Sequence, residues 1–144
     1  MARTTTKRTS KSKAFALSTR HLTTLKLPYP PSINRYYGTR GKQTFIRREG
    51  REYRDRVMDI LVPVFHELET YGGPLQVWIE VFQPDRRRRD LDNISKALLD
   101  AITHSGVWLD DSQIVDLRYI RSGVEKGGYV RLHISEVTDA PSAP

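Results

Sequence analysis

Four residues near the middle of the chain have the side-chain types that phosphodiester hydrolysis requires. Asp90 and Asp92 lie two positions apart, Lys96 follows four residues later, and Asp111 comes after a further apolar stretch. Such hydrolysis near neutral pH needs hard cations, which prefer carboxylate oxygens. If the segment is extended, Asp90 and Asp92 project to one side. Lys96, one helical turn beyond Asp92, could stabilise the phosphorane or orient the attacking water.

Each of these residues also has a structural explanation. Asp92 stands where a helix N-cap is expected, and Lys96 can pair with Asp92 or Asp100. Asp110 and Gln113 have the spacing of a capping-box turn. Taken together these explanations are weaker, because carboxylates so close to one another repel unless a cation neutralises them. The cluster therefore favours a cation site.

The apolar pattern predicts the elements that position this cluster. Leu25 and Leu27 alternate with polar residues, which indicates an edge strand that stops at Pro28. Between residues 48 and 68 apolar positions recur every three or four residues, which predicts an amphipathic helix that kinks or ends early at Pro63. The residues expected on its apolar face are Tyr53, Val57, Ile60, Leu61, Val64 and Leu68.

Residues 75–82 alternate as a strand does, and residues 94–102 predict a second helix that stops near Ser105 and Gly106. Two more strands are expected over 114–121 and 129–135, joined by a glycine-containing turn. The residues expected on the buried face of the last strand are Val130, Leu132 and Ile134. The order β-α-β-α-β-β, with a terminal hairpin, predicts an α+β fold. It is a single domain with a mixed sheet of about four strands and two main helices.

The charge balance indicates a polyanionic partner. Twenty-four Lys and Arg residues against 17 Asp and Glu give a net charge of +7. Nucleic acid is the first candidate, and a merely basic protein is the alternative. Residues 34–42 interleave aromatic and basic side chains, which suits base stacking, although a turn with packed tyrosines has the same composition. The candidate DNA-binding residues are Arg35, Lys42, Arg86, Arg87, Arg88 and Arg89.

The two ends of the chain differ from its middle. Residues 1–22 are predicted to be a disordered basic tail and residues 137–144 a frayed stub, which leaves residues 23–136 as the folded domain. The chain has no cysteine, which excludes disulfides, a thiolate nucleophile and cysteine zinc sites. No run is long and apolar enough for a membrane span or a secretory signal, so a cytoplasmic protein with no membrane partner is expected.

One long string contains most of these features. The residues PDRRRRDLDNISKALLDAI at 84–102, followed by GVWLDDSQI at 106–114, resemble the RusA family of Holliday junction resolvases. The segments PPS at 30–32, NRYY at 34–37 and KGG at 126–128 are similar to further features of that family. The resemblance covers about residues 25–136, so the folded domain is interpreted as a RusA-like nuclease domain.

The resemblance implies a homodimeric, Mg²⁺-dependent endodeoxyribonuclease, with Mn²⁺ as a substitute ion. Such an enzyme makes paired symmetric nicks in a DNA four-way junction during recombination and repair. By position, the metal-binding aspartates fall on Asp90, Asp92 and Asp111, and the supporting lysine on Lys96. A bacterial, phage or prophage origin is expected. Two alternatives stay open, which are a non-catalytic DNA-binding or architectural protein, and a nuclease of this fold that acts on forks or flaps.

Overall fold

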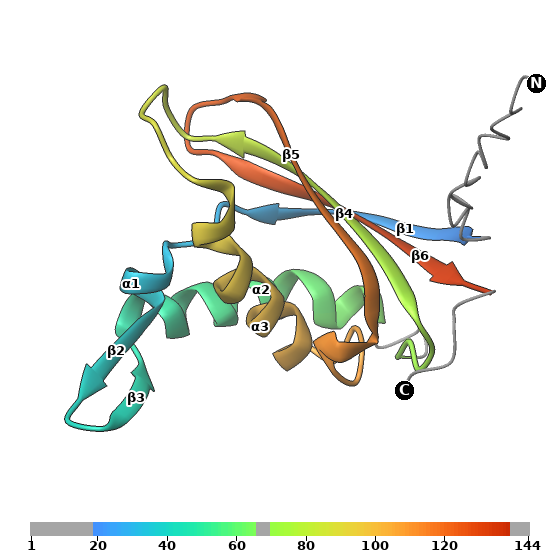
Figure 1. Ribbon diagram of the computed structural model, residues 1–144, viewed down its shortest axis with the longest axis horizontal. Helices are drawn as coiled ribbons and strands as arrows, with labels where there is room; N and C mark the ends of the chain where they lie inside the picture. The colour runs from blue at the N-terminus through green and yellow to red at the C-terminus, as the bar shows by residue number, and fades with distance from the viewer. Residues whose placement is uncertain (1–18, 66–69, 139–144) are drawn as a thin grey trace, which may run out of the picture.

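The computed structural model describes residues 19–65 and 70–138, and the side chains from residue 23 onward within those ranges. A four-stranded mixed sheet lies on one side of the molecule, and two main helices cover one of its faces (Figure 1). The strands are β1 (Thr19–Pro28), β4 (Leu75–Gln83), β5 (Ile114–Val124) and β6 (Tyr129–Val137), and the helices are α2 (Arg48–Phe65) and α3 (Ser95–His104). The predicted α+β fold is therefore confirmed.

The strand boundaries extend slightly beyond the predicted ones. β1 begins at Thr19, inside the range 1–22 that the sequence assigned to the tail, and β6 ends at Val137, inside the range assigned to the stub. Residues 1–18 and 139–144 lie outside the described residues, as does Leu68. β1 is an edge strand that ends at Pro28, as predicted.

The predicted terminal hairpin is wrong. The strand order is β1-β6-β4-β5, so β4 lies between β5 and β6, pairing in parallel with β5 and antiparallel with β6. The turn after β5 crosses the end of β4, where Glu125 N donates to Gln83 O at 2.8 Å. Gly127 and Gly128 both have positive φ, and a Cβ at Gly128 would lie 2.9 Å from Pro84 N. Two glycines thus allow a close crossing where the sequence suggested a hairpin turn.

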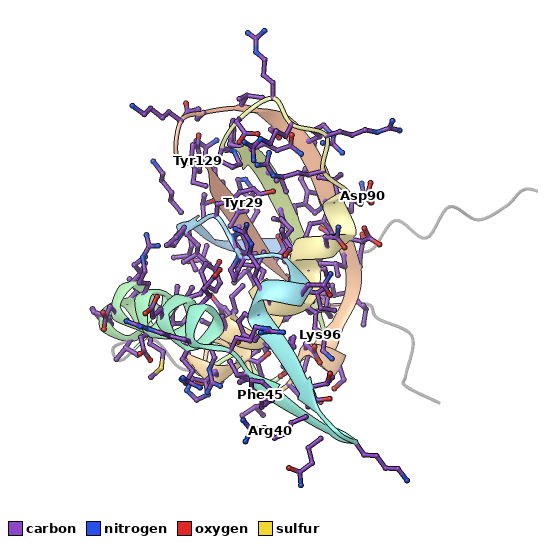
Figure 2. All side chains as sticks on the ribbon, turned by 90° about the vertical axis from the view of Figure 1, so that its left-hand side faces the viewer. Tyr29, Arg40, Phe45, Asp90, Lys96 and Tyr129 are labelled. Carbon is purple, nitrogen blue, oxygen red and sulfur yellow. The ribbon has the colours of Figure 1, made fainter. Side chains whose placement is uncertain are left out.

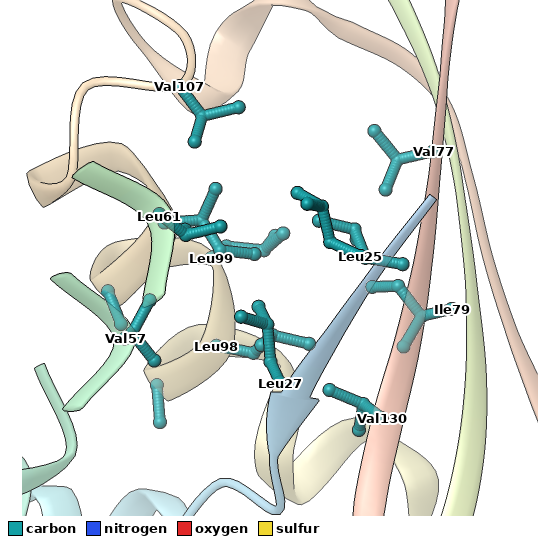
Figure 3. Packing of buried hydrophobic residues seen from close by; sticks show 14 of the residues in the cluster. Leu25, Leu27, Val57, Leu61, Val77, Ile79, Leu98, Leu99, Val107 and Val130 are labelled. Atoms are coloured by element: carbon teal, nitrogen blue, oxygen red, sulfur yellow. The ribbon is translucent and has the colours of Figure 1, made fainter. Parts of the chain in front are cut away.

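The core lies between the sheet and the two helices (Figure 3). The inward residues of β4 and the predicted residues of β6 are completely buried. On α2 the predicted Tyr53, Val57 and Leu61 are buried, together with Phe65. Ile60 and Val64 are 38% and 40% exposed, so their predicted burial is wrong. The buried residues follow one row at a spacing of four, and residues 60 and 64 flank that row. Pro63 lies inside α2.

A small element was missed between β1 and α2. The short helix α1 (Ile33–Tyr36) leads into a two-stranded hairpin of β2 (Tyr37–Arg40) and β3 (Gln43–Ile46), which projects away from the main sheet (Figure 1). The sequence predicted an irregular loop here. The Tyr36 ring is completely buried, so the alternative of packed tyrosines is correct for that residue.

Candidate active site

Asp85 holds together the charged segment that follows β4, residues 84–90. Its carboxylate accepts two hydrogen bonds from the Arg89 guanidinium and one, at 2.9 Å, from Arg87 N. Arg121 Nη2 in turn donates to Arg89 O at 2.9 Å, which ties the segment to β5. The Arg89 side chain, and then the Arg87 backbone, hold the pKa of Asp85 well below its ordinary value. Arg89 therefore has its charge matched within the chain. Arg87 Nε also lies 3.9 Å from Asp85 Oδ2, but its side chain is exposed, as are those of Arg86 and Arg88.

We expect Asp85→Asn to lower the melting temperature at neutral pH and to flatten its pH dependence in acid. The folded pKa of Asp85 lies below the ordinary 3.8, so its ion pair stabilises the fold above that pH. That stability is lost as the pH falls towards the folded value. Thermal denaturation followed by circular dichroism from about pH 5 to about pH 2 measures this difference. Asp59→Asn, at an exposed site on α2, is the control. Parallel curves for Asp85→Asn and wild type would contradict the expectation.

Asp90 and Asp92 do not share an extended segment, because a turn begins between them. Asp90 is extended, but residues 91–94 form the 3-10 helix η1 (Leu91–Ile94). The predicted role of Asp92 as N-cap of α3 is wrong, because Ile94 occupies that position. A 3-10 turn has three residues per turn, so it directs both Leu91 and Ile94 towards the core. Asp92 is left exposed at the surface.

Lys96 lies in the first turn of α3. Its Nζ is 4.9 Å from the centroid of the Tyr37 ring, which begins hairpin β2–β3. Within the described part of the chain, Lys96 makes this cation-π contact and forms no ion pair with Asp92 or Asp100. The lysine therefore marks the place where the hairpin meets α3, as Figure 2 shows.

The turn before β5 separates the two adjacent aspartates. Asp110 is the N-cap of the 3-10 helix η2 (Asp111–Gln113), and its carboxylate accepts a 2.7 Å hydrogen bond from Ser112 Oγ. Gln113 Oε1 accepts from Asp110 N at 3.0 Å, and Gln113 Nε2 donates to the carbonyls of Tyr71 and Gly73. The predicted local role of Asp110 and Gln113 is confirmed. Asp111 is left exposed.

Asp111 faces Asp100 across the end of α3. Burial, and then the Asp111 charge, raise the pKa of Asp100 above its ordinary value. Partial desolvation and the neighbouring Asp110 raise the pKa of Asp111, while the Ser112 hydroxyl lowers that of Asp110. The sequence considered Asp100 only as a partner for Lys96. Asp100 lies four residues after Lys96 and eight after Asp92, and this spacing could have indicated that the three side chains share one helix face.

The three predicted metal ligands do not meet within one chain. Asp90 follows the carboxyl end of β4 and Asp111 precedes the amino end of β5, and these are opposite ends because the two strands are parallel. Within residues 19–65 and 70–138, no group of three His, Cys, Asp or Glu side chains is close enough to hold a metal ion. The donor chemistry fits a hard cation such as Mg²⁺. A single chain brings together Asp100 and Asp111, whereas Asp90 lies at the other end of the parallel strand pair.

A groove of about 1000 Å³ lies beside Asp90. It is bounded by the loop after β1, by α1 and α2, and by the charged segment after β4. Several arginines line it, although Glu49 and Glu52 also contribute. Its charged and aromatic lining residues include Tyr29, Arg35, Tyr53, Arg56, Arg87, Arg88, Arg89 and Asp90. Of the predicted DNA-binding residues, Arg86 and Lys42 lie outside its lining. Arg56 and Tyr29 were missed, although the exposed face of α2 is basic in the sequence.

Comparison with known proteins identifies the family. The sequence profile described as Endodeoxyribonuclease RusA matches residues 28–135. This chain belongs to the RusA endodeoxyribonuclease family. It is 46% identical over 121 residues to the crossover junction endodeoxyribonuclease rusA of Enterobacteria phage 82, which covers 84% of this chain and 98% of the relative. The RusA proteins of Shigella sonnei strain Ss046 and Escherichia coli strain K12 are 46% and 45% identical over 113 residues, covering 78% of this chain and 93% of each relative.

The RusA match spans the whole of the candidate site. It includes the hairpin β2–β3, the charged segment, α3 and the η2 turn, and it stops before the end of β6. RusA family membership indicates a divalent-metal-dependent nuclease with a DNA junction as substrate. Among the described helices, none has the length and apolar character that a membrane span requires.

Proposed function

We propose that this chain is a structure-selective endodeoxyribonuclease that resolves Holliday junctions by paired symmetric nicks. The observation that carries the proposal is the basic groove, which brings Arg35, Arg87 and Arg88 to the side of Asp90. A groove of this charge binds the phosphate backbone, and a carboxylate at its wall suits cleavage rather than binding alone. A role in DNA recombination and repair and a cytoplasmic location stay predictions.

The proposed catalytic residues are Asp90, Asp92, Asp111 and Lys96. The three aspartates would hold Mg²⁺, which supplies Lewis-acid stabilisation of the phosphorane and a water of lowered pKa. Lys96, fixed over the Tyr37 ring, presents its ammonium group at the surface where it can pair with a phosphate oxygen. Arg87 and Arg88 hold the backbone on either side of the cut, because their side chains are exposed beside Asp90.

A homodimer would bring the separated aspartates together. β5 is an open edge of the sheet among the described strands, and it exposes Val115, Leu117, Ile120 and Val124. A long apolar edge strand is normally covered or paired. Antiparallel pairing of two β5 strands about a twofold axis would place the amino end of one beside the carboxyl end of the other. Near the carboxyl end of β5, the Arg121 side chain donates a hydrogen bond to the Arg89 backbone, next to Asp90. Asp111 of the partner subunit could then complete the site.

Subunit mixing tests this composite arrangement. Mixed dimers formed by co-expressing Asp92→Asn and Asp111→Asn chains should nick only one of the two opposing strands of a junction, because one site carries both changes and the other carries neither. If each chain holds a complete site, every site in the mixed dimer is damaged and no cleavage appears. A monomer in analytical ultracentrifugation would exclude the dimer altogether.

The function itself is tested by incubating the protein with labelled four-way junction, fork, flap and duplex DNA. Symmetric nicks in the junction with Mg²⁺ or Mn²⁺, and none with chelator, are expected. Equal or faster cutting of forks or flaps would favour the related nuclease. Binding without any cleavage, in every divalent cation, would favour the architectural protein.

A further inference from the structure

Tyr37 and Ile46 at the base of the hairpin β2–β3 pack against the core, but the part beyond them is explained neither by the core nor by metal binding. We propose that Phe45 on this hairpin stacks on a base that is exposed at the branch point of the junction, and so contributes to the choice of junction over duplex. This inference rests on the proposed function, because it concerns the same substrate.

The base of the hairpin is firmly held against α2. Arg47 N donates to Tyr36 O at 2.8 Å and Arg47 Nε donates to Tyr37 O at 2.9 Å. Arg51 Nη1 donates to Ile46 O, also at 2.9 Å. Gly50 lets this close approach happen, since a Cβ there would lie 2.7 Å from Tyr36 O. The two strands therefore leave the domain in a defined direction.

Phe45 lies outside the core although it is the largest apolar side chain of the hairpin. It pairs with Gly38 across the hairpin and is 43% exposed. A Cβ on Gly38 would lie 2.5 Å from Phe45 Cζ, so the ring rests directly over the glycine. The backbone of Gly38 therefore covers one face of the Phe45 ring. The exposed remainder is available for another flat group.

The surroundings of Phe45 favour a nucleic-acid base over an apolar protein surface. Its exposed neighbours on the hairpin are polar or basic, namely Thr39, Arg40, Lys42, Gln43 and Thr44. One aromatic ring among cations and hydroxyls is typical of surfaces that stack bases and hold the adjoining phosphates. A protein-docking patch would need a larger continuous apolar area.

The hairpin begins at the candidate active site. Tyr37 carries the Lys96 ammonium over its ring, and Phe45 and Arg40 lie further along the hairpin (Figure 2). A base inside a continuous duplex is covered on both sides by its neighbours, so a protein ring cannot reach its face without unstacking it. Where strands exchange at a four-way junction, that cost is lower. Stacking by Phe45 would therefore strengthen binding to a junction more than to a duplex.

Binding in Ca²⁺ to a four-way junction and to a matched duplex tests the proposal with Phe45→Ala, Phe45→Leu and Phe45→Trp. Loss of one stacked base corresponds to about tenfold weaker junction binding. We expect this loss for the alanine and leucine variants, recovery with tryptophan, and unchanged duplex binding throughout. Lys42→Gln is the matched control, because removal of a tip cation should weaken junction and duplex binding alike.

A photo-crosslink gives a second readout that does not depend on cleavage. 5-Iododeoxyuridine at the branch point should crosslink to Phe45, and the same base in the middle of an arm should not. The proposal is overturned if Phe45→Leu binds the junction as wild type does, if Phe45→Ala keeps the junction-to-duplex ratio, or if the crosslink maps elsewhere. If the wild type cuts no junction, the proposed function fails instead.

Discussion

Replacement of Asp92 by asparagine is expected to abolish strand cleavage and to leave junction binding intact. The change removes a negative charge from the exposed turn η1, next to Asp90 and one helical turn before Lys96. It removes no basic residue and no core contact, because Asp92 points to solvent while Ile94 packs inward. An amide is a much weaker ligand for a hard cation than a carboxylate. The chemical step should therefore be lost without loss of affinity.

Single-turnover cleavage of a fixed junction at saturating protein measures this effect, with binding measured separately in Ca²⁺. Asp59→Asn makes the same chemical change at an exposed position on α2 and should cut as wild type does. Mg²⁺-dependent cutting by a homogeneous Asp92→Asn sample would remove Asp92 from the set of ligands.

The parts of the fold that follow from local periodicity were predicted well. The alternating residues of β4 and β6 are completely buried on their predicted faces. The end of α3 at Ser105 and Gly106 also agrees, because Gly106 takes the positive φ that terminates a helix. These signals depend only on neighbours within a few positions, which a sequence shows directly.

The errors concern relations between distant segments. Strands β5 and β6 are consecutive and joined by a glycine turn, yet β4 lies between them. Local residues do not distinguish a hairpin turn from a crossing over a third strand. The hairpin β2–β3 was missed because its strands are only four residues long and mostly exposed, so they carry little apolar alternation.

The candidate site shows the same division. The sequence predicted the residue types at the site but treated Arg86 to Arg89 as equivalent. Only the packing shows that Arg89 is half-buried and bound by Asp85 through two hydrogen bonds, while Arg87 and Arg88 are exposed in the groove and Arg86 lies outside it. The sequence also predicted one aspartate cluster, whereas the parallel pairing of β4 and β5 separates Asp111 from Asp90 within a chain.

Asp110 and Asp111 are adjacent in sequence, but their replacement is expected to have opposite consequences. Asp111→Asn should abolish cleavage, and Asp110→Asn should retain substantial activity. The Asp110 carboxylate already accepts a hydrogen bond from Ser112 within the turn. The Asp111 carboxylate is exposed, and its charge adds to burial in raising the pKa of Asp100, while burial and Asp110 raise its own pKa. A bound cation would offset this accumulated negative charge.

The melting temperature distinguishes a metal ligand, the role expected of Asp111, from a structural residue, the role of Asp110. A raised carboxyl pKa means that the folded state disfavours ionisation, so the ionised Asp111, through its partial burial and its charge near Asp110 and Asp100, costs stability at neutral pH. Asp111→Asn should therefore keep or raise the melting temperature without metal, and lose the further rise that Mg²⁺ gives the wild type. Asp110→Asn should lower the melting temperature, because it weakens the turn that Gln113 and Ser112 hold. If Asp110→Asn is inactive and Asp111→Asn cuts normally, the assignment is reversed, and the turn before β5 must present the other carboxylate to the metal.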